Sequence, residues 1–263
     1  MSASGTPRPD TFDIHLFDLD GVVTPTAAVH MRAWAQMFTS FLASRGVAEP
    51  YTDEGYFAYV DGKPRYDGVA SFLASRGIAL PQGEPGDPSD QEAGAETVCG
   101  LGNRKNDEVL RMIREDGVEP YPGTVAYLDA LAADGERIRL AVVSSSRNAE
   151  EVLRGAGLRE RFEVVVDGNV AEHEGLPGKP APDTFVHAAR LLGGEPARAV
   201  VYEDAVAGVR AGAAGDFGAV VGVDRGVGHR ALAEAGASLV VSDLAELLEP
   251  RHDQKHDQKE EQA

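Results

Sequence analysis

The sequence contains a single cysteine, Cys99, so no disulfide bond can form within the chain. No apolar run approaches the ~20 residues that a membrane-spanning helix requires. The first ten residues, MSASGTPRPD, lack the apolar centre of a signal peptide. We therefore expect a cytoplasmic protein that does not contact a membrane.

Basic residues are also scarce. The chain has 25 Lys and Arg against 43 Asp and Glu, which gives a formal charge of −18. Proteins that bind nucleic acid normally present a basic face, so this composition argues against nucleic acid and anionic membranes as partners. Since the overall field repels anions, an anionic substrate would have to be held by local cations.

The most informative stretch is TFDIHLFDLDG, residues 11–21. The run from Ile14 to Phe17 is typical of a buried strand, and it ends in Asp18, Asp20 and Gly21. Residues two apart in an extended chain share a face, so both carboxylates can point into one space. Their repulsion calls for a cation or an ionisable partner, although an acidic surface turn is the simpler alternative.

After Gly123 the pattern alternates between β-rich runs and helical segments, which predicts a parallel sheet covered by helices. Before it, about 100 mostly helical residues follow the first strand, which indicates an insertion over the Asp18 turn. We predict an α/β fold: a doubly wound parallel-sheet (Rossmann-like) core with an inserted small helical cap. The expected segments are a flexible arm (1–10), the core (11–25 and 121–249), the cap (26–120) and a disordered tail (250–263).

Polar residues follow three of the expected strands: Asp18 with Asp20, Ser144, and Glu203 with Asp204. Ligands of such sheets bind beyond the carboxyl ends of the strands, so these residues and Lys179, from the segment GKPAPD, could share a pocket. Clustered oxygen ligands suit Mg²⁺. Lys179 and Ser144 could hold phosphoryl oxygens, one carboxylate could take up phosphate, and a second could act as acid and base.

Each of these residues also has an ordinary structural interpretation. Lys179 could be a surface lysine, Ser144 a helix N-cap, and Glu203-Asp204 a cap for the helix that starts near Val206. Taken singly, these interpretations are at least as good as the functional ones. The order of the residues along an alternating fold favours the functional interpretation.

The segments FDLDG, VVSSS, GKPAPD and YEDAVAG, in this order, resemble the four motifs of the haloacid dehalogenase superfamily of phosphotransferases. The resemblance covers residues from about 12 to 248. It implies that Asp18 is the nucleophile and Asp20 the acid and base, and that Ser144 and Lys179 hold the transferred phosphate. It further implies Mg²⁺ bound by Asp18, the Asp20 carbonyl and Asp204, with Glu203 acting through water.

The helical insert resembles the cap of the β-phosphoglucomutase-like branch of this superfamily, with departures at Pro25 and Asp61. Several residues match positions that contact substrate or the hinge in that branch. These candidate substrate-binding residues are Thr26, His30, Gly62, Arg65, Lys105, Asn106, Ser145, Ser146, Arg147 and Asn148.

A sugar phosphomutase handles a sugar with a phosphate at each end, so it needs two cationic sites that face each other. Lys179 with Mg²⁺ could form one, and Arg65, Lys105 and Arg147 the other. Our first hypothesis is a monomeric Mg²⁺-dependent mutase that interconverts β-glucose 1-phosphate and glucose 6-phosphate through an aspartyl phosphate and a sugar bisphosphate. The alternatives are a phosphatase acting on small phosphorylated sugars and a non-catalytic phosphosugar-binding protein.

Overall fold

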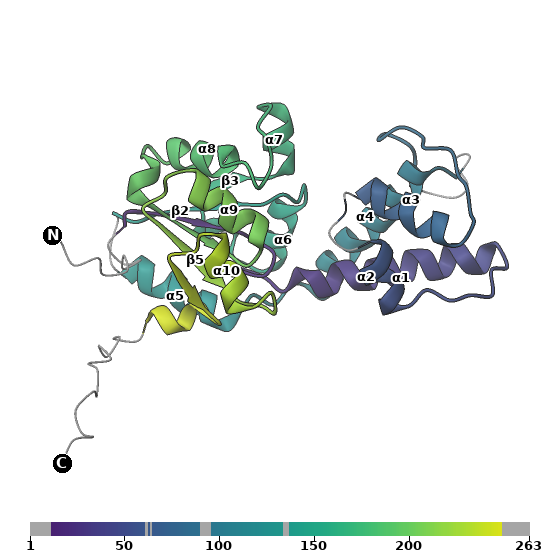
Figure 1. The fold of residues 1–263 in the computed structure, drawn as a ribbon, viewed down its shortest axis with the longest axis horizontal. Coiled ribbons are helices and arrows are strands. Elements are labelled where there is room, and N and C mark those ends of the chain that lie inside the picture. The colour runs from purple at the N-terminus through teal and green to yellow at the C-terminus, as the bar shows by residue number, and fades with distance from the viewer. Residues whose placement is uncertain (1–11, 61–62, 64, 90–95, 134–136, 249–263) are drawn as a thin grey trace, which may run out of the picture.

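The computed structural model describes residues 12–60, 63, 65–89, 96–133 and 137–248. The predicted arm at residues 1–10, the predicted tail at 250–263 and the candidate residue Gly62 lie outside the described residues. The chain forms a core built around a sheet and a separate group of helices, joined by adjacent connecting segments (Figure 1). This arrangement confirms the predicted α/β core with an inserted helical cap, while the proposed domain boundaries stay a prediction.

The described strands form one parallel six-stranded sheet in the order β3-β2-β1-β4-β5-β6. The central position of β1 places its carboxyl end between those of β2 and β4. The strands are β1 (Ile14–Phe17), β2 (Arg139–Val143), β3 (Val164–Val166), β4 (Ala199–Glu203), β5 (Ala219–Val223) and β6 (Leu239–Val241).

Helices cover both faces of the sheet because side chains alternate along each strand. On one face Phe17 packs in a cluster with residues of α5 (Pro122–Ala133) and α6 (Ala149–Gly155). On the other face Leu16 packs with residues of α8 (Asp183–Leu191), α9 (Val206–Ala214) and α10 (His229–Ala235). The remaining short helices of the core are α7 (Gly168–His173), η2 (Arg159–Arg161), η3 (Pro196–Arg198) and η4 (Leu244–Leu247).

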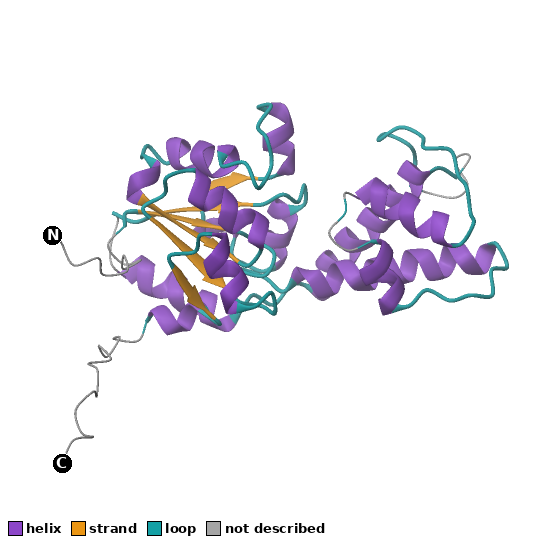
Figure 2. Cartoon of the chain, in the orientation of Figure 1, coloured by secondary structure: helices purple, strands orange, loops and turns teal. Residues whose placement is uncertain are grey.

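The described part of the insert consists of helices and loops (Figure 2). It contains α1 (Thr26–Ser44), α2 (Asp53–Tyr59), α3 (Arg65–Ser75) and α4 (Val98–Asp116). Its own hydrophobic cluster is centred on Phe38 and Phe72, whose ring centroids lie 4.0 Å apart. The aromatic and methionine stripe of α1, including Trp34, Met37 and Phe41, is buried there, so these residues form core.

Helix α4 belongs to two hydrophobic clusters. Val98 and Leu101, near its start, pack in the cap cluster, whereas Val109 and Ile113 pack with the core. The helix begins at Val98, where the Thr97 hydroxyl caps it by accepting a hydrogen bond from the Gly100 N–H at 2.9 Å. The cap is therefore packed onto the core through one continuous helix.

Helix α7 was not predicted. The Asp167 carboxylate caps it by accepting hydrogen bonds of 2.9 Å from the N–H groups of Asn169 and Val170. Among the described residues, no helix combines the length and the apolar character needed to cross a bilayer.

Candidate active site

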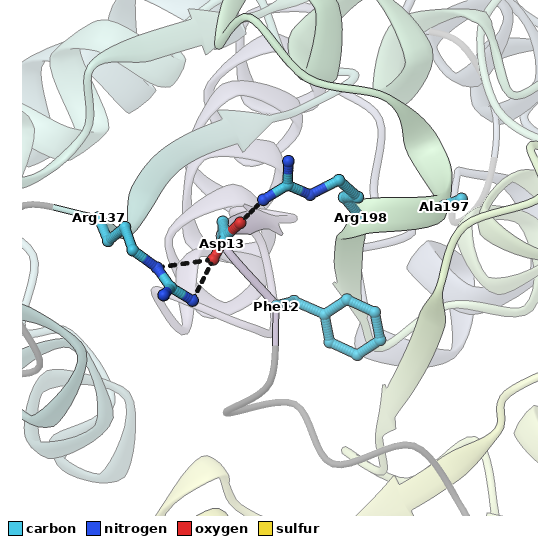
Figure 3. A pocket seen from close by; sticks show the side chains of 5 residues that line it. All are labelled: Phe12, Asp13, Arg137, Ala197 and Arg198. Carbon is cyan, nitrogen blue, oxygen red and sulfur yellow. Dashed lines mark hydrogen bonds and ion pairs between the residues drawn. The ribbon is translucent and has the colours of Figure 1, made fainter.

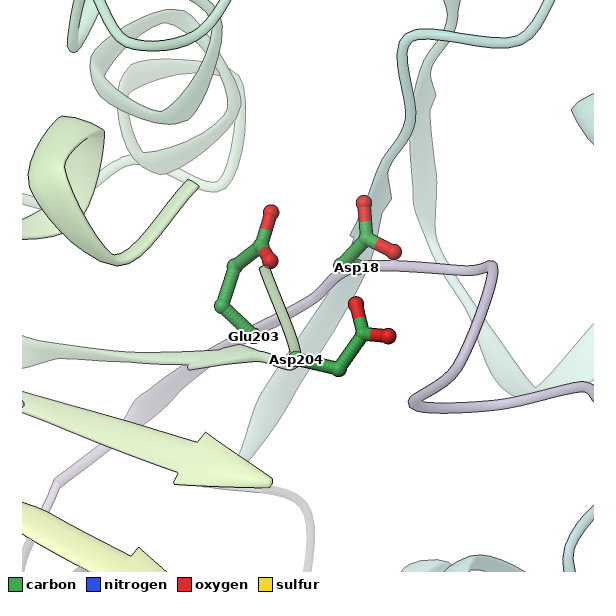
Figure 4. A group of neighbouring side chains, drawn as sticks. All are labelled: Asp18, Glu203 and Asp204. Carbon is green, nitrogen blue, oxygen red and sulfur yellow. The ribbon is translucent and has the colours of Figure 1, made fainter. Parts of the chain in front are cut away.

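Three carboxylates meet at the carboxyl edge of the sheet. Asp18 follows β1 directly, Glu203 ends the neighbouring β4, and Asp204 comes next. Each offers an oxygen, and these oxygens lie within 4.8 Å of one another (Figure 4). The backbone fixes the approach of the two strands, because the Asp18 N–H donates to the Tyr202 carbonyl at 2.9 Å. The predicted convergence of these residues is confirmed.

Lys179 brings a positive charge into this carboxylate cluster. Its Nζ forms an ion pair with Asp18, lies 2.7 Å from Glu203 Oε1 and donates to the Val143 carbonyl at 3.0 Å. Only 9% of its side chain is exposed. The interpretation of Lys179 as a surface lysine is therefore wrong. A buried ammonium at this position offsets part of the repulsion between the acids.

Burial dominates the electrostatics of the cluster. It raises the pKa of Asp18 well above its usual value, with Lys179 acting in the opposite direction. It also raises the pKa of Asp20, and it raises that of Asp204 to about 7. Burial disfavours the ammonium form of Lys179, but the carboxylates of Asp18 and Glu203 together hold its pKa above the usual range. Such perturbed groups in one place are typical of a reactive site.

Ser144 is buried directly after β2, beside Asp18 at the end of β1. Its hydroxyl oxygen accepts a hydrogen bond from the Ser146 N–H at 3.0 Å. The N-cap of α6 is Asn148, and it makes no side-chain cap, so the interpretation of Ser144 as the N-cap is wrong. Ser145 is exposed at the tip of this turn and Ser146 is half-buried.

The expectation that Glu203 or Asp204 caps α9 also fails. The N-cap of α9 is Ala205, and no side chain caps the helix. Instead, Glu203 Oε2 accepts from the Ala205 N–H at 2.9 Å, and its other oxygen faces Lys179. Both carboxylates are thus available to the cluster.

Asp20 and Gly21 form a tight turn between β1 and the cap. The Gly21 N–H donates to the Thr24 carbonyl at 2.8 Å, and the buried Thr26 hydroxyl donates to Asp20. Gly21 has φ +93°, and a Cβ atom there would lie 2.0 Å from an Asp204 oxygen. Only glycine allows the backbone to approach Asp204 this closely.

On the cap side, the buried Lys105 pairs with the half-buried His30. Lys105 Nζ lies 2.8 Å from His30 Nδ1 and 4.9 Å from the centroid of the Trp34 ring. Burial, with Arg65 nearby, lowers the pKa of Lys105 to about 7. Burial, together with Lys105 and Arg65, lowers the pKa of His30 to about 3, so this ring is neutral and can accept from Lys105. Burial raises the pKa of Asp20, and Lys105 is one of the groups that act in the opposite direction by favouring its charged form.

A second group joins the cap to the core. Asn106 Oδ1 accepts from Arg65 Nη2 at 2.7 Å and from Asn148 Nδ2 at 2.8 Å. Arg147, next to Asn148, lies near enough to lower the pKa of Arg65, although burial is the larger cause. The Arg147 guanidinium pairs at 2.9 Å with Glu172 of α7. Asn106 and Arg65 of the cap therefore lie at the turn after β2.

The donor set of the cluster fits a hard divalent cation. Three carboxylates offer only oxygen atoms, which is the chemistry that Mg²⁺ prefers. The ammonium of Lys179 beside them suits a phosphoryl group, which carries negative charge of its own. The arrangement can therefore hold a phosphate ester with its phosphorus close to a carboxylate.

Comparison with known proteins agrees with this chemistry. Residues 12–216 match the family model of a haloacid dehalogenase-like hydrolase. The chain belongs to the haloacid dehalogenase-like hydrolase family.

Individual relatives point to one branch of the family. The chain is 48% identical over 252 residues to the β-phosphoglucomutase of Mycobacterium tuberculosis, which covers 91% of this chain and 93% of that protein. It is 33% identical over 242 residues to the β-phosphoglucomutase of Bacillus subtilis, with 91% and 93% covered. A crystal structure of CbbY from Rhodobacter sphaeroides in complex with phosphate is 25% identical, with a TM-score of 0.66, and covers 90% of this chain and 96% of that one.

Two features of this haloacid dehalogenase-like site were missed by sequence reasoning. A Cβ atom at Gly208 in α9 would lie 1.6 Å from Glu203 Oε1, so glycine makes room for that carboxylate. Glu172, which holds Arg147, lies on the unpredicted α7. The glycine could have been noticed, since it closes the YEDAVAG motif, whereas the contact of Glu172 depends on the fold.

A hollow of about 300 Å³ opens at the other end of the sheet (Figure 3). Asp13 lies in its centre, where Arg137 Nη2 contacts Oδ1 at 2.9 Å and Arg198 contacts the other oxygen. Its lining residues are Phe12, Asp13, Arg137, Ala197 and Arg198. These residues lie at the amino ends of the strands, away from the predicted site, and they include none of its residues.

Proposed function

We propose that this protein is a Mg²⁺-dependent β-phosphoglucomutase that interconverts β-glucose 1-phosphate and glucose 6-phosphate. The observation that carries the proposal is that cationic side chains from both the core and the cap act on Asp20. Lys179 lies among the carboxylates of the core, and Lys105, with Arg65 near it, belongs to the cap. A phosphatase needs only the first group. The similarity to two β-phosphoglucomutases over most of the chain supports the same conclusion.

In the proposed reaction an Asp18 oxygen attacks one phosphorus of the sugar bisphosphate, and the bond between that phosphorus and the sugar oxygen breaks, which leaves an aspartyl phosphate and a sugar monophosphate. Asp20 gives a proton to the departing oxygen, and in the return step it removes the proton from the hydroxyl that attacks the aspartyl phosphate. Its raised pKa suits a group that must carry a proton. Phosphate added at one end and removed at the other passes through a sugar bisphosphate that turns round in the site.

Lys179 and Ser144 would hold the phosphoryl oxygens during transfer. Asp18, Asp204 and the Asp20 carbonyl would bind Mg²⁺, with Glu203 acting through water. The ion would supply positive charge that lets an anionic nucleophile approach an anionic phosphate.

Arg65, Lys105, Asn106, Arg147 and Asn148 would hold the phosphate that is not transferred. Thr26 and His30 would position Asp20 and Lys105, and closure of the cap would keep water from the aspartyl phosphate. Both groups come from one chain, so we propose that the enzyme works as a monomer.

A coupled assay tests the proposal. The protein, Mg²⁺, β-glucose 1-phosphate and a trace of the bisphosphate should yield glucose 6-phosphate. Release of inorganic phosphate and free glucose alone would instead identify a phosphatase acting on sugar phosphates. Asp18→Asn should abolish turnover, since an amide cannot replace the nucleophile; retained activity would exclude the covalent route.

A second variant tests the pair of cationic groups. Arg65→Ala should reduce isomerisation roughly tenfold or more, while hydrolysis of a simple aryl phosphate, which has no second phosphate, changes little. Equal losses in both reactions would show that Arg65 does not bind a distal phosphate. Lys63→Ala is the matched control, because this cap residue donates to Ser71 at an exposed position.

A further inference from the structure

Two neighbouring segments connect the cap to the core. The chain leaves the core through residues 18–25 and returns through residues 117–121. The Tyr121 N–H donates to the Val23 carbonyl at 3.0 Å, and the Thr124 hydroxyl donates to the Val22 carbonyl at 2.7 Å. The two connecting segments are therefore bonded to each other where they meet the core.

Arg225, two residues after β5, contacts both segments. Its Nε donates to the Gly21 carbonyl at 2.9 Å, and its guanidinium carbon lies 3.7 Å from the centroid of the Tyr121 ring. Its Nη1 donates to the Ser242 carbonyl at 3.0 Å, which fixes the side chain to the loop after β6. One side chain thus joins the outgoing segment, the returning segment and the core.

The contact with Gly21 has a direct bearing on the site. Gly21 lies next to Asp20, and its backbone passes so close to Asp204 that no side chain fits at position 21. Because Gly21 has no side chain, neighbouring residues can orient this part of the turn only through its backbone. The guanidinium of Arg225 orients it through the carbonyl.

Arg225 also pairs with Asp243, 3.5 Å from its Nη1, so it contributes to stability as well as to the position of Gly21. Its side chain is only 20% exposed, and its Nη2 is buried without a hydrogen-bond partner among the described residues. An unsatisfied buried donor lowers stability. The flat guanidinium nevertheless offers both a stacking face for Tyr121 and a donor for Gly21.

We propose that Arg225 is a positioning residue of the reaction. It holds the Gly21 turn and the Tyr121 segment in one fixed arrangement, so that Asp20 and the cap meet the substrate together. The proposal rests on the proposed mutase function, because it concerns the step in which Asp20 transfers a proton under a closed cap.

The test compares Arg225→Ala, Arg225→Lys and the control Arg230→Ala. Arg230 is 91% exposed and pairs only with Glu234 within its own helix, among the contacts of the described residues. The measurements are kcat and KM for isomerisation, the phosphate released for each glucose 6-phosphate formed, thermal unfolding, and hydrogen exchange at the Tyr121 amide.

For Arg225→Ala we expect kcat to fall by about tenfold to a hundredfold with KM little changed, because a displaced acid and base slows the chemical step. The share of phosphate lost to water should rise, and exchange at the Tyr121 amide should accelerate. Arg225→Lys, which can still donate to Gly21, should recover part of kcat. Arg230→Ala should match the unchanged protein in all four measurements.

The proposal is overturned if Arg225→Ala keeps the kcat of the unchanged protein. It is also overturned if Arg225→Lys restores the stability that Arg225→Ala loses but restores none of the kcat. If the unchanged protein forms no glucose 6-phosphate, the proposed mutase function is wrong, whatever the role of Arg225. The role of Arg225 is then decided by aryl phosphate turnover and by exchange at the Tyr121 amide. Unchanged values of both in Arg225→Ala overturn it.

Discussion

Lys105 combines a positive charge with almost complete burial, and this combination sets its behaviour at neutral pH. Burial brings its pKa to about 7, so the ammonium and the amine are present in similar amounts. A bound phosphate favours the ammonium. Above pH 7 the site must therefore take up a proton to bind its ligand, and binding weakens as pH rises.

We predict that KM for β-glucose 1-phosphate increases above pH 7, approaching about tenfold per pH unit. The measurement is a series of KM values between pH 6 and pH 9. Lys105→Arg keeps its charge throughout and should lose this dependence, which separates Lys105 from the titration of the substrate. A KM that stays flat in the unchanged protein would refute the assignment of Lys105.

Gly208 is a residue whose lack of a side chain matters to the site. A methyl group there would overlap the Glu203 carboxylate and push it from its place beside Lys179. We predict that Gly208→Ala lowers the free energy of unfolding by about 1–3 kcal/mol and reduces kcat. Chemical denaturation and steady-state kinetics check both effects.

The control for this prediction is Gly86→Ala. A Cβ atom at Gly86 would have no neighbour within 4 Å, and its φ lies outside the left-handed region. Its stability should stay within about 0.5 kcal/mol of the unchanged protein. If Gly208→Ala has no larger effect than Gly86→Ala, the added methyl group does not displace the Glu203 carboxylate, and the prediction is wrong.

Among the elements, α7 has a connection to the site that its sequence does not reveal. Glu172 on this helix pairs with Arg147, a candidate phosphate ligand, and both side chains are more than half exposed. A substrate phosphate would compete with Glu172 for the same guanidinium. The exposed pair is weak, so its removal should have a modest effect.

We predict that Glu172→Gln lowers KM for the sugar phosphate by up to about fivefold, since an exposed ion pair contributes about 0.2–1 kcal/mol. Glu174→Gln, which removes a carboxylate at the end of the same helix, is the control for the change in net charge. Equal effects of the two substitutions on KM would mean that the change in net charge, and not the release of Arg147, causes the effect.

The elements also show what sequence reasoning can and cannot reach. Asp18, Ser144 and Glu203 were placed together because IHLF, RLAVV and AVVYE lie in short apolar, β-rich runs, and parallel strands end at one edge. Helix α7 was missed because GNVAEH has only two apolar residues, and its cap Asp167 looks like a strand end. The contacts of Glu172 and Arg225 join residues far apart in the chain, and no local pattern encodes them.

For the molecule as a whole, a bound cation should add to stability, because the carboxylate cluster forms only when the strands of the core assemble. We predict that Mg²⁺ at 100 times its Kd raises Tm by about 5–10 °C. Asp204→Asn should remove this increase, whereas Glu172→Gln should keep it. Thermal unfolding with and without Mg²⁺, and after chelation, provides the measurement. An increase that persists in Asp204→Asn would place the ion elsewhere.

Helix α4 packs in two hydrophobic clusters. Val98 and Leu101 pack in the cluster of the cap, and Val109 and Ile113 pack in the cluster of the core. If the cap moves against the core while both clusters stay packed, the helix has to bend over the roughly two turns from Gly102 to Glu108. Lys105 and Asn106 lie in this span. A bend in this span would move both residues, and with them any ligand that they bind. Ligand binding by Lys105 and Asn106 is therefore coupled to the angle between the cap and the core.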